Sequence, residues 1–297
     1  MIGKRKAHLA TFCANLIYGA NFSIAKLVMP EMIKPSGFIL LRVFFATILF
    51  WIMKFFTAKN QQIERKDMFR FFLLGLFGVA INQLLFFNGL ARTSNINAAL
   101  IMTSNPVMVL VFAALLVGER ITFQRIGGIA LGITGAALLI LMSNVRGIGS
   151  FSGDLMVFTN AASYAIFIVM VKPMMQKYNT WVVLGWTFFF GLLIVIPFGY
   201  SDLSLINWST FEPIHWMAVV FVIFFTTFLA YLLNTLGLKE LSPAVVSYYI
   251  YLQPIFATAI SMAIHHESLQ WIQILACFLI FAGVWLVTQP TFVRTKS

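Results

Sequence analysis

The chain has 297 residues, of which 61% are hydrophobic and 10% are charged, and it contains 32 phenylalanines. Soluble domains are roughly 45–50% apolar and about 25% charged, so this composition excludes an ordinary soluble protein. The net charge of +11 comes from lysines and arginines scattered at the ends of apolar runs. Such scatter argues against nucleic-acid binding and is typical of orientation signals in membrane proteins.

In chain order, apolar runs between charges and Pro, Gly or Asn breaks predict an all-α polytopic membrane protein with ten spans. Each run is close to the roughly 20 residues that a helix needs to cross a bilayer. The first run follows basic residues like a signal peptide, but its length and lack of a small-x-small cleavage pattern predict a retained span. The predicted spans are 8–28, 36–56, 70–91, 96–117, 125–142, 155–172, 180–199, 216–238, 243–264 and 270–288.

The distribution of basic residues predicts the orientation. With the N-terminus inside, fifteen lysines and arginines fall on inner ends and loops, whereas only Lys34, Arg92 and Arg146 fall outside. Cytoplasmic loops carry the excess of Lys and Arg, so both termini are expected in the cytoplasm.

A repeat divides the chain into two halves, 8–142 and 154–288, separated by a Ser/Gly/Asn-rich linker. Residues 89–138 return as 237–286, 148 positions later (237 against 89). Because each half has five spans, the second must enter the membrane in the opposite orientation, as in many secondary transporters. The matched landmarks include Gly89 and Gly237, Ser94 and Ser242, Pro106 and Pro254, Glu119 and Glu267, and Gly135 and Gly283, with Tyr18 and Lys26 answered by Tyr164 and Lys172.

Four segments carry a resemblance to a known family: YGANFSIAK from residue 18, SNPVMVLVFAALLVGER from 104, its echo YLQPIFATAISMAIHHES from 251, and GGIALGITGAALLI from 127. Together with ten predicted spans they resemble the EamA-type branch of the drug/metabolite transporter (DMT) superfamily. The resemblance implies a membrane carrier similar to exporters of amino acids, nucleotide sugars, drugs and other metabolites. Ser268 stands where the first copy has Arg120, a departure that the inverted topology explains.

Polar residues near the middle of a span are costly in lipid and therefore indicate candidate solute-binding positions. They concentrate on spans one, three and four and on their repeat mates six, eight and nine, while spans two, five, seven and ten look like apolar scaffold. The alternative is that these side chains only join helices. The predicted substrate-binding residues are Asn15, Tyr18, Asn82, Gln83, Asn105, Asn160, Tyr164, Thr227, Tyr231, Tyr251 and Gln253.

Pro106 and Pro254 are predicted hinge or kink positions, because proline removes a backbone donor inside a helix. A static kink is the alternative. Lys26 and Lys172 are expected to anchor helix ends. Arg42 is expected to pair with Glu31 or an outer carbonyl, with a gating role and a structural role both open.

No metal or cofactor is expected. The adjacent His265, His266 and Glu267 point to different helix faces, and Cys13 and Cys277 form no ligand pattern. Paired glutamates Glu119 and Glu267 are expected to cap or pair at helix ends. Small residues Gly128, Gly132 and Ala136 are expected to pack span five within the chain, although a dimer seam is possible, so the expected state is a monomer or weak homodimer.

These patterns predict a secondary transporter of small organic metabolites such as amino acids, working by alternating access in a bacterial inner membrane, with a small solute and the lipid bilayer as partners and no nucleic acid. Export is favoured by the family resemblance alone. A passive channel is one alternative. A membrane-embedded enzyme acting on lipid-linked substrates is another, disfavoured because no nucleophile, base or metal set converges.

Overall fold

The computed structural model describes residues 3–59, 61–118, 123–146, 149–264 and 269–288. All regular elements in these ranges are helical, since in lipid a helix satisfies its own backbone hydrogen bonds. In chain order they are α1 (Lys4–Lys26), α2 (Pro35–Thr57), α3 (Arg65–Gly75), η1 (Leu76–Ala80), α4 (Ile81–Leu90), α5 (Asn95–Met102), α6 (Asn105–Val117), α7 (Phe123–Arg146), α8 (Phe151–Lys177), α9 (Thr180–Ser204), η2 (Trp208–Thr210), α10 (Pro213–Val220), η3 (Phe221–Leu229), α11 (Ala230–Glu240), α12 (Pro243–Tyr248), η4 (Tyr249–Tyr251), α13 (Leu252–Ile264) and α14 (Trp271–Thr288).

Within the described ranges, seven helices are long and apolar enough to cross a membrane, some formed by elements that join end to end. Two shorter apolar stretches, Ile126–Met142 and Trp271–Gly283, lie in α7 and α14. Helix α1 has 23 residues, which suffices for a span, but its sequence is more polar. The seven are Pro35–Thr57, Arg65–Leu90, Asn95–Val117, Phe151–Lys177, Thr180–Ser204, Pro213–Glu240 and Pro243–Ile264.

Helix starts coincide with landmarks of the repeat. Ser94 and Ser242 each cap a helix, with the side-chain oxygen accepting from the backbone N–H of Asn97 (3.0 Å) and Val245 (3.3 Å). Helix α6 ends at Gly118, whose φ of 76° lies in the left-handed region that glycine adopts without strain. The repeated serines therefore mark the same structural position in both halves.

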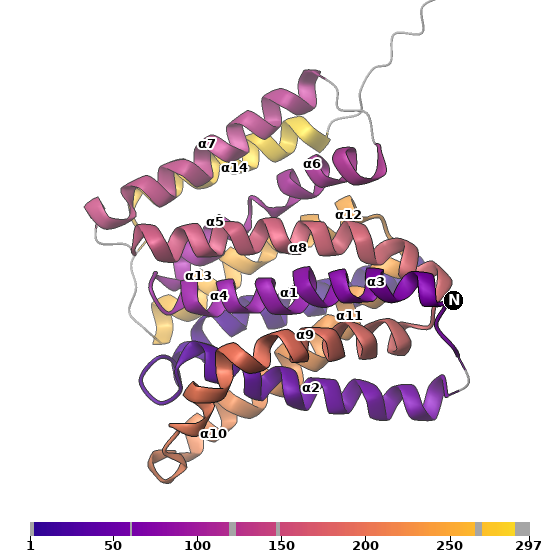
Figure 1. Ribbon diagram of the computed structural model, residues 1–297. Coiled ribbons are helices and arrows are strands. Elements are labelled where there is room, and N and C mark those ends of the chain that lie inside the picture. Colours follow the sequence, from indigo (N-terminus) through magenta and orange to yellow (C-terminus); the bar gives the residue numbers. More distant parts are fainter. Residues whose placement is uncertain (1–2, 60, 119–122, 147–148, 265–268, 289–297) are drawn as a thin grey trace, which may run out of the picture.

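Two helix pairs flank the bundle, α7 with α14 at one edge and α2 with α9 at the other (Figure 1). A Cβ atom at Gly135 would lie 2.8 Å from the carbonyl oxygen of Ala276, and one at Gly283 would lie 2.5 Å from that of Gly128. The α7 and α14 backbones are therefore in direct, antiparallel contact. The predicted stripe of small residues packs α7 within the chain.

Lys26 and Lys172 occupy the same position in each half and make the same contact. The Nζ atom of Lys26 donates to the carbonyl of Thr93 at 2.5 Å, and that of Lys172 donates to the carbonyl of Leu241 at 2.7 Å. The acceptors follow the ends of α4 and α11. Lys172 Nζ also donates to the Leu238 carbonyl in the last turn of α11 at 2.5 Å. Each lysine therefore anchors the end of a neighbouring helix or the turn that follows it.

Candidate functional site

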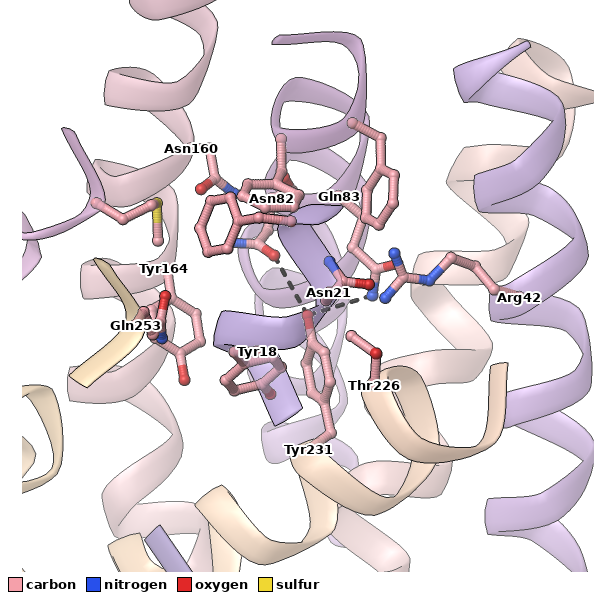
Figure 2. A pocket seen from close by; sticks show the side chains of 14 residues that line it. Tyr18, Asn21, Arg42, Asn82, Gln83, Asn160, Tyr164, Thr226, Tyr231 and Gln253 are labelled. Carbon is pink, nitrogen blue, oxygen red and sulfur yellow. Dashed lines mark hydrogen bonds between the residues drawn. The ribbon is translucent and has the colours of Figure 1, made fainter. Parts of the chain in front are cut away.

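A cavity lies at the centre of the bundle, where α1, α4, α8 and α11 approach α2 and η3 (Figure 2). Its volume is about 70 Å³. Small-molecule sites commonly span about 300–1,000 Å³, so the cavity in this conformation is narrower than such a site. The lining residues are Tyr18, Asn21, Phe22, Arg42, Asn82, Gln83, Phe86, Phe87, Met102, Asn160, Tyr164, Thr226, Tyr231 and Gln253.

The structure brings seven of the eleven predicted substrate-binding residues to this cavity. They are contributed by both halves of the chain. The seven are Tyr18, Asn82, Gln83, Asn160, Tyr164, Tyr231 and Gln253.

The four remaining predicted residues, Asn15, Asn105, Thr227 and Tyr251, are not among those that line the cavity. Tyr251 packs edge-to-face on Phe281 of α14, with ring centroids 5.1 Å apart. The prediction used only the depth of a residue in the membrane. It therefore included residues that pack against neighbouring helices as well as residues that face the cavity.

The hydroxyl of Tyr231 joins the two halves beside the cavity. It donates to the carbonyl of Gly78 at 2.9 Å and accepts from Nε2 of Gln83 at 3.2 Å. Asn82 Oδ1 lies 3.2 Å from the same hydroxyl (Figure 2). Gln83 and Tyr231 occupy equivalent positions in the two repeats (231 against 83). Their hydrogen bond therefore joins the same position of the first and second halves.

Both halves have a π-helical segment at the corresponding place, η1 in the first and η3 in the second. A π-helical turn interrupts the regular backbone pairing and is frequent at functional sites. In η1 the Phe77 and Gly78 carbonyls accept hydrogen bonds from Ser163 (2.6 Å) and Tyr231. A Cβ atom at Gly78 would lie 2.3 Å from the ring of Phe167, so this glycine permits the close approach of α8.

The residues before the two predicted kink prolines bind helices of the opposite half. Asn105 Nδ2 donates to the carbonyl of Ala161 at 2.7 Å, and Gln253 Nε2 donates to Asn15 Oδ1 at 2.7 Å. The two donors occupy equivalent positions in the repeats (253 against 105), and so do the two acceptor residues (161 against 15). These bonds hold α6 against α8 and α13 against α1.

The chain departs from regular α-helix just before both prolines. Helix α5 ends at Met102 and α6 begins at Asn105, whereas in the second half the 3-10 turn η4 precedes α13. Hydroxyls of Thr103 and Ser104 bond back to the Leu100 (2.5 Å) and Ile101 (2.7 Å) carbonyls at this break. Regular α-helix is therefore interrupted before both prolines. A kink or hinge at Pro106 and Pro254 remains a prediction.

Arg42 corrects the expectation that α2 is only scaffold, because its side chain lines the cavity. Its Nε atom donates to Thr227 Oγ1 at 2.7 Å, so its partner is Thr227 and not Glu31. Asn21 and Phe22 were also missed. They follow Tyr18 by three and four residues, the spacing of one helix face, and that spacing could have revealed them.

The two cysteines, Cys13 and Cys277, are free. Within the described residues, no group of three or more His, Cys, Asp or Glu side chains is arranged to hold a metal ion. The predicted helix-end residues Glu119 and Glu267, and the pair His265 and His266, lie outside the described residues.

A central cavity between two duplicated bundles of apolar helices defines a multi-pass membrane protein of the transporter class. The chain belongs to the EamA-like transporter family, whose profile matches residues 5–141 and again residues 151–289. This family is part of the drug/metabolite transporter superfamily.

Relatives cover almost the whole chain. An uncharacterized transporter of Bacillus subtilis, YyaM, is 29% identical over 91% of this chain and 89% of its own length. An uncharacterized transporter of Archaeoglobus fulgidus is 22% identical over 95% of this chain and 97% of its own. A solved crystal structure with 19% identity superposes with a TM-score of 0.64 over 95% of this chain and 96% of the other, which shows the fold. The bacterial relatives indicate the cell membrane.

Proposed function

We propose that the protein is a secondary carrier that moves small organic metabolites, with export as its direction, by alternating access around the central cavity. The main support is that residues of both repeats line this cavity, with Tyr18 and Tyr164 at equivalent positions. A site between two repeats lets their relative motion open it to either side in turn. Amino acids are the first class to test.

The proposed architecture has ten spans, as two inverted five-helix halves at residues 8–142 and 154–288, with both termini in the cytoplasm. Lys26 and Lys172 make equivalent contacts in their own halves, and Asn105 and Gln253 make equivalent contacts to the opposite half, which supports a twofold relation. The antiparallel contact between α7 and α14, the last helices of each half, supports inversion.

Purified protein in liposomes tests this function. We expect saturable uptake of a labelled solute and counterflow, in which an unlabelled internal solute drives accumulation of the labelled one. A passive channel gives neither accumulation nor trans-stimulation. Uptake that stays linear with concentration in a panel of amino acids, sugars and nucleotides would contradict the carrier proposal.

Two variants connect the flux to the cavity. Tyr164→Ala and Gln253→Ala are expected to lower the counterflow rate about tenfold or more while the protein still reaches the membrane, because each removes a polar contact at the cavity wall. Tyr200→Ala is the control, since the Tyr200 side chain is 69% exposed at the end of α9. Full counterflow in both cavity variants would remove the site assignment.

The enzyme alternative is tested with the same preparation. Turnover of a labelled lipid-linked precursor without counterflow of any solute would favour that alternative. The family assignment favours transport.

A further inference from the structure

Arg42 places a buried cation in the wall of the central cavity. The residue lies within the first turns of α2 and is 2% exposed. Figure 2 shows its guanidinium directed from α2 toward Asn21 and Gln83. A charged group removed from water is unfavourable unless a negative charge or a full set of hydrogen bonds compensates it.

The contacts of Arg42 with the protein satisfy only part of the guanidinium. Its Nε atom donates to Thr227 Oγ1, which in turn donates to the carbonyl of Val222 at 2.7 Å. Its Cζ atom lies 4.2 Å from the centroid of the Phe87 ring. The Nη1 atom is buried and has no hydrogen-bond partner.

Among the described residues, no carboxylate neutralises this charge. The residues that line the cavity include neither Asp nor Glu. The two buried acids of the described chain are engaged elsewhere: Asp67 pairs with Lys177 at 2.5 Å, and Asp154 accepts from Asn97 at 2.6 Å. The cavity is therefore electropositive at Arg42.

We propose that the carried solute is a small organic anion whose negatively charged head group binds Arg42. This inference rests on the proposed transport function and names its substrate class. The head group, a carboxylate or a phosphate monoester, accepts a charge-assisted hydrogen bond from Nη1 and supplies the missing negative charge. An apolar body of the solute lies against the rings of Phe22 and Phe86.

Other unpartnered polar atoms of the cavity fit such a solute. The hydroxyls of Tyr18 and Thr226 are buried without partners and can donate to the head group. The amide oxygens of Asn21 and Gln83 are also buried without partners. They suit a hydroxyl or ammonium group placed beside the anion on the same solute.

A purely structural role for Arg42 would be to hold η3 in place through Thr227. Three substitutions distinguish this structural role from anion binding. Thr227→Val keeps the side-chain shape and the arginine charge but removes the Nε acceptor. Arg42→Gln removes the charge and keeps hydrogen-bonding capacity, and Arg42→Lys keeps the charge without the planar fork.

The test measures binding to purified full-length protein in detergent by calorimetry. The probes are acids and their neutral primary amides: 3-phenylpropionate with 3-phenylpropionamide, hexanoate with hexanamide, and cyclohexanecarboxylate with its carboxamide. We expect the acid of at least one pair to bind the wild-type protein about tenfold or more tighter than its amide, the range for hydrogen bonds to charged groups. Arg42→Gln should abolish this preference, Arg42→Lys should retain part of it, and Thr227→Val should retain it. Phenyl phosphate, compared with 3-phenylpropionate, distinguishes a phosphate from a carboxylate head group.

Equal binding of acid and amide in every pair, or no binding of any acid, would overturn the proposal. So would an acid preference that survives in Arg42→Gln with unchanged magnitude. Counterflow separates this result from the transport function. A carrier that exchanges neutral solutes and shows no acid preference keeps the transport function and loses the anion inference. If acid binding depends on Arg42 but the protein shows no counterflow, the anion site is kept and the transport function is lost.

Discussion

The hydroxyl of Tyr231 contacts groups on two helical segments of the opposite half, the carbonyl of Gly78 in η1 and the amide of Gln83 in α4. Tyr231 is itself 5% exposed, so these partners have little access to water. Removing the hydroxyl leaves a buried acceptor and a buried donor without this partner, and such loss costs about 1–3 kcal/mol.

Tyr231→Phe is therefore expected to lower the apparent Tm in detergent and to reduce the free energy of unfolding by about 1–3 kcal/mol, while the ring still fills its space. Tyr200→Phe is the matched control, because the exposed Tyr200 side chain should lose its hydroxyl without effect. Equal Tm values for Tyr231→Phe and the wild type would show that the hydroxyl contributes nothing to joining the halves.

The sequence predicted which polar residues lie near the middle of a span, but not which of them face the cavity. Mid-span position selected Tyr18 and Gln83, which line the cavity, and it also selected Tyr251, which packs against α14. Facing direction depends on the rotation of each helix, and that rotation is set by partners far along the chain. Arg42 escaped prediction for the same reason, since its partner Thr227 is 185 residues away.

At the scale of elements, the seam between α7 and α14 depends on the absence of side chains at two glycines, Gly135 and Gly283. Gly135 faces Ala276 and Ile280, while Gly283 faces the backbone of Gly128. The two contacts are equivalent by the repeat (276 against 128). Close backbone approach of this kind replaces hydrophobic attraction as the source of helix association in lipid.

Gly135→Ala is expected to destabilise the protein by about 1–3 kcal/mol, because the new Cβ atom would sit 2.7 Å from Ile280 Cγ1 and 2.8 Å from the Ala276 carbonyl oxygen. Gly127→Ala on the same helix is the control. A Cβ there has nothing within 4 Å, and alanine is the better helix former. Thermal unfolding of both variants in detergent measures the difference. A Gly135→Ala protein as stable as Gly127→Ala would refute the tight seam.

Element positions were the most predictable feature, because long apolar runs and serine caps are local signals. The predicted bounds of the spans differ from those of the helices by at most five residues. The π-helical segments η1 and η3 carried no such signal. They are stabilised by contacts across the bundle, as between Ser163 and the Phe77 carbonyl.

At the scale of the molecule, duplication organises both the bundle and the cavity. Matching contacts recur within each half, as for the anchoring lysines, and between the halves, as for the amides before the prolines. The repeat was readable from its landmarks, and the charge distribution predicts that the second copy is inverted. Solute identity was not readable from sequence, because it depends on which polar atoms of the cavity lack protein partners.

The central claim is that the halves are one unit facing opposite sides of the membrane, and thiol labelling tests it most directly. In a Cys13→Ser, Cys277→Ser background, single cysteines replace Gln62, before α3, or Ser204, at the end of α9, both of which are exposed. With a membrane-impermeant maleimide, the cysteine at 204 should react in intact cells, and the cysteine at 62 only after permeabilisation. Reaction of both from the same side would contradict the inverted arrangement.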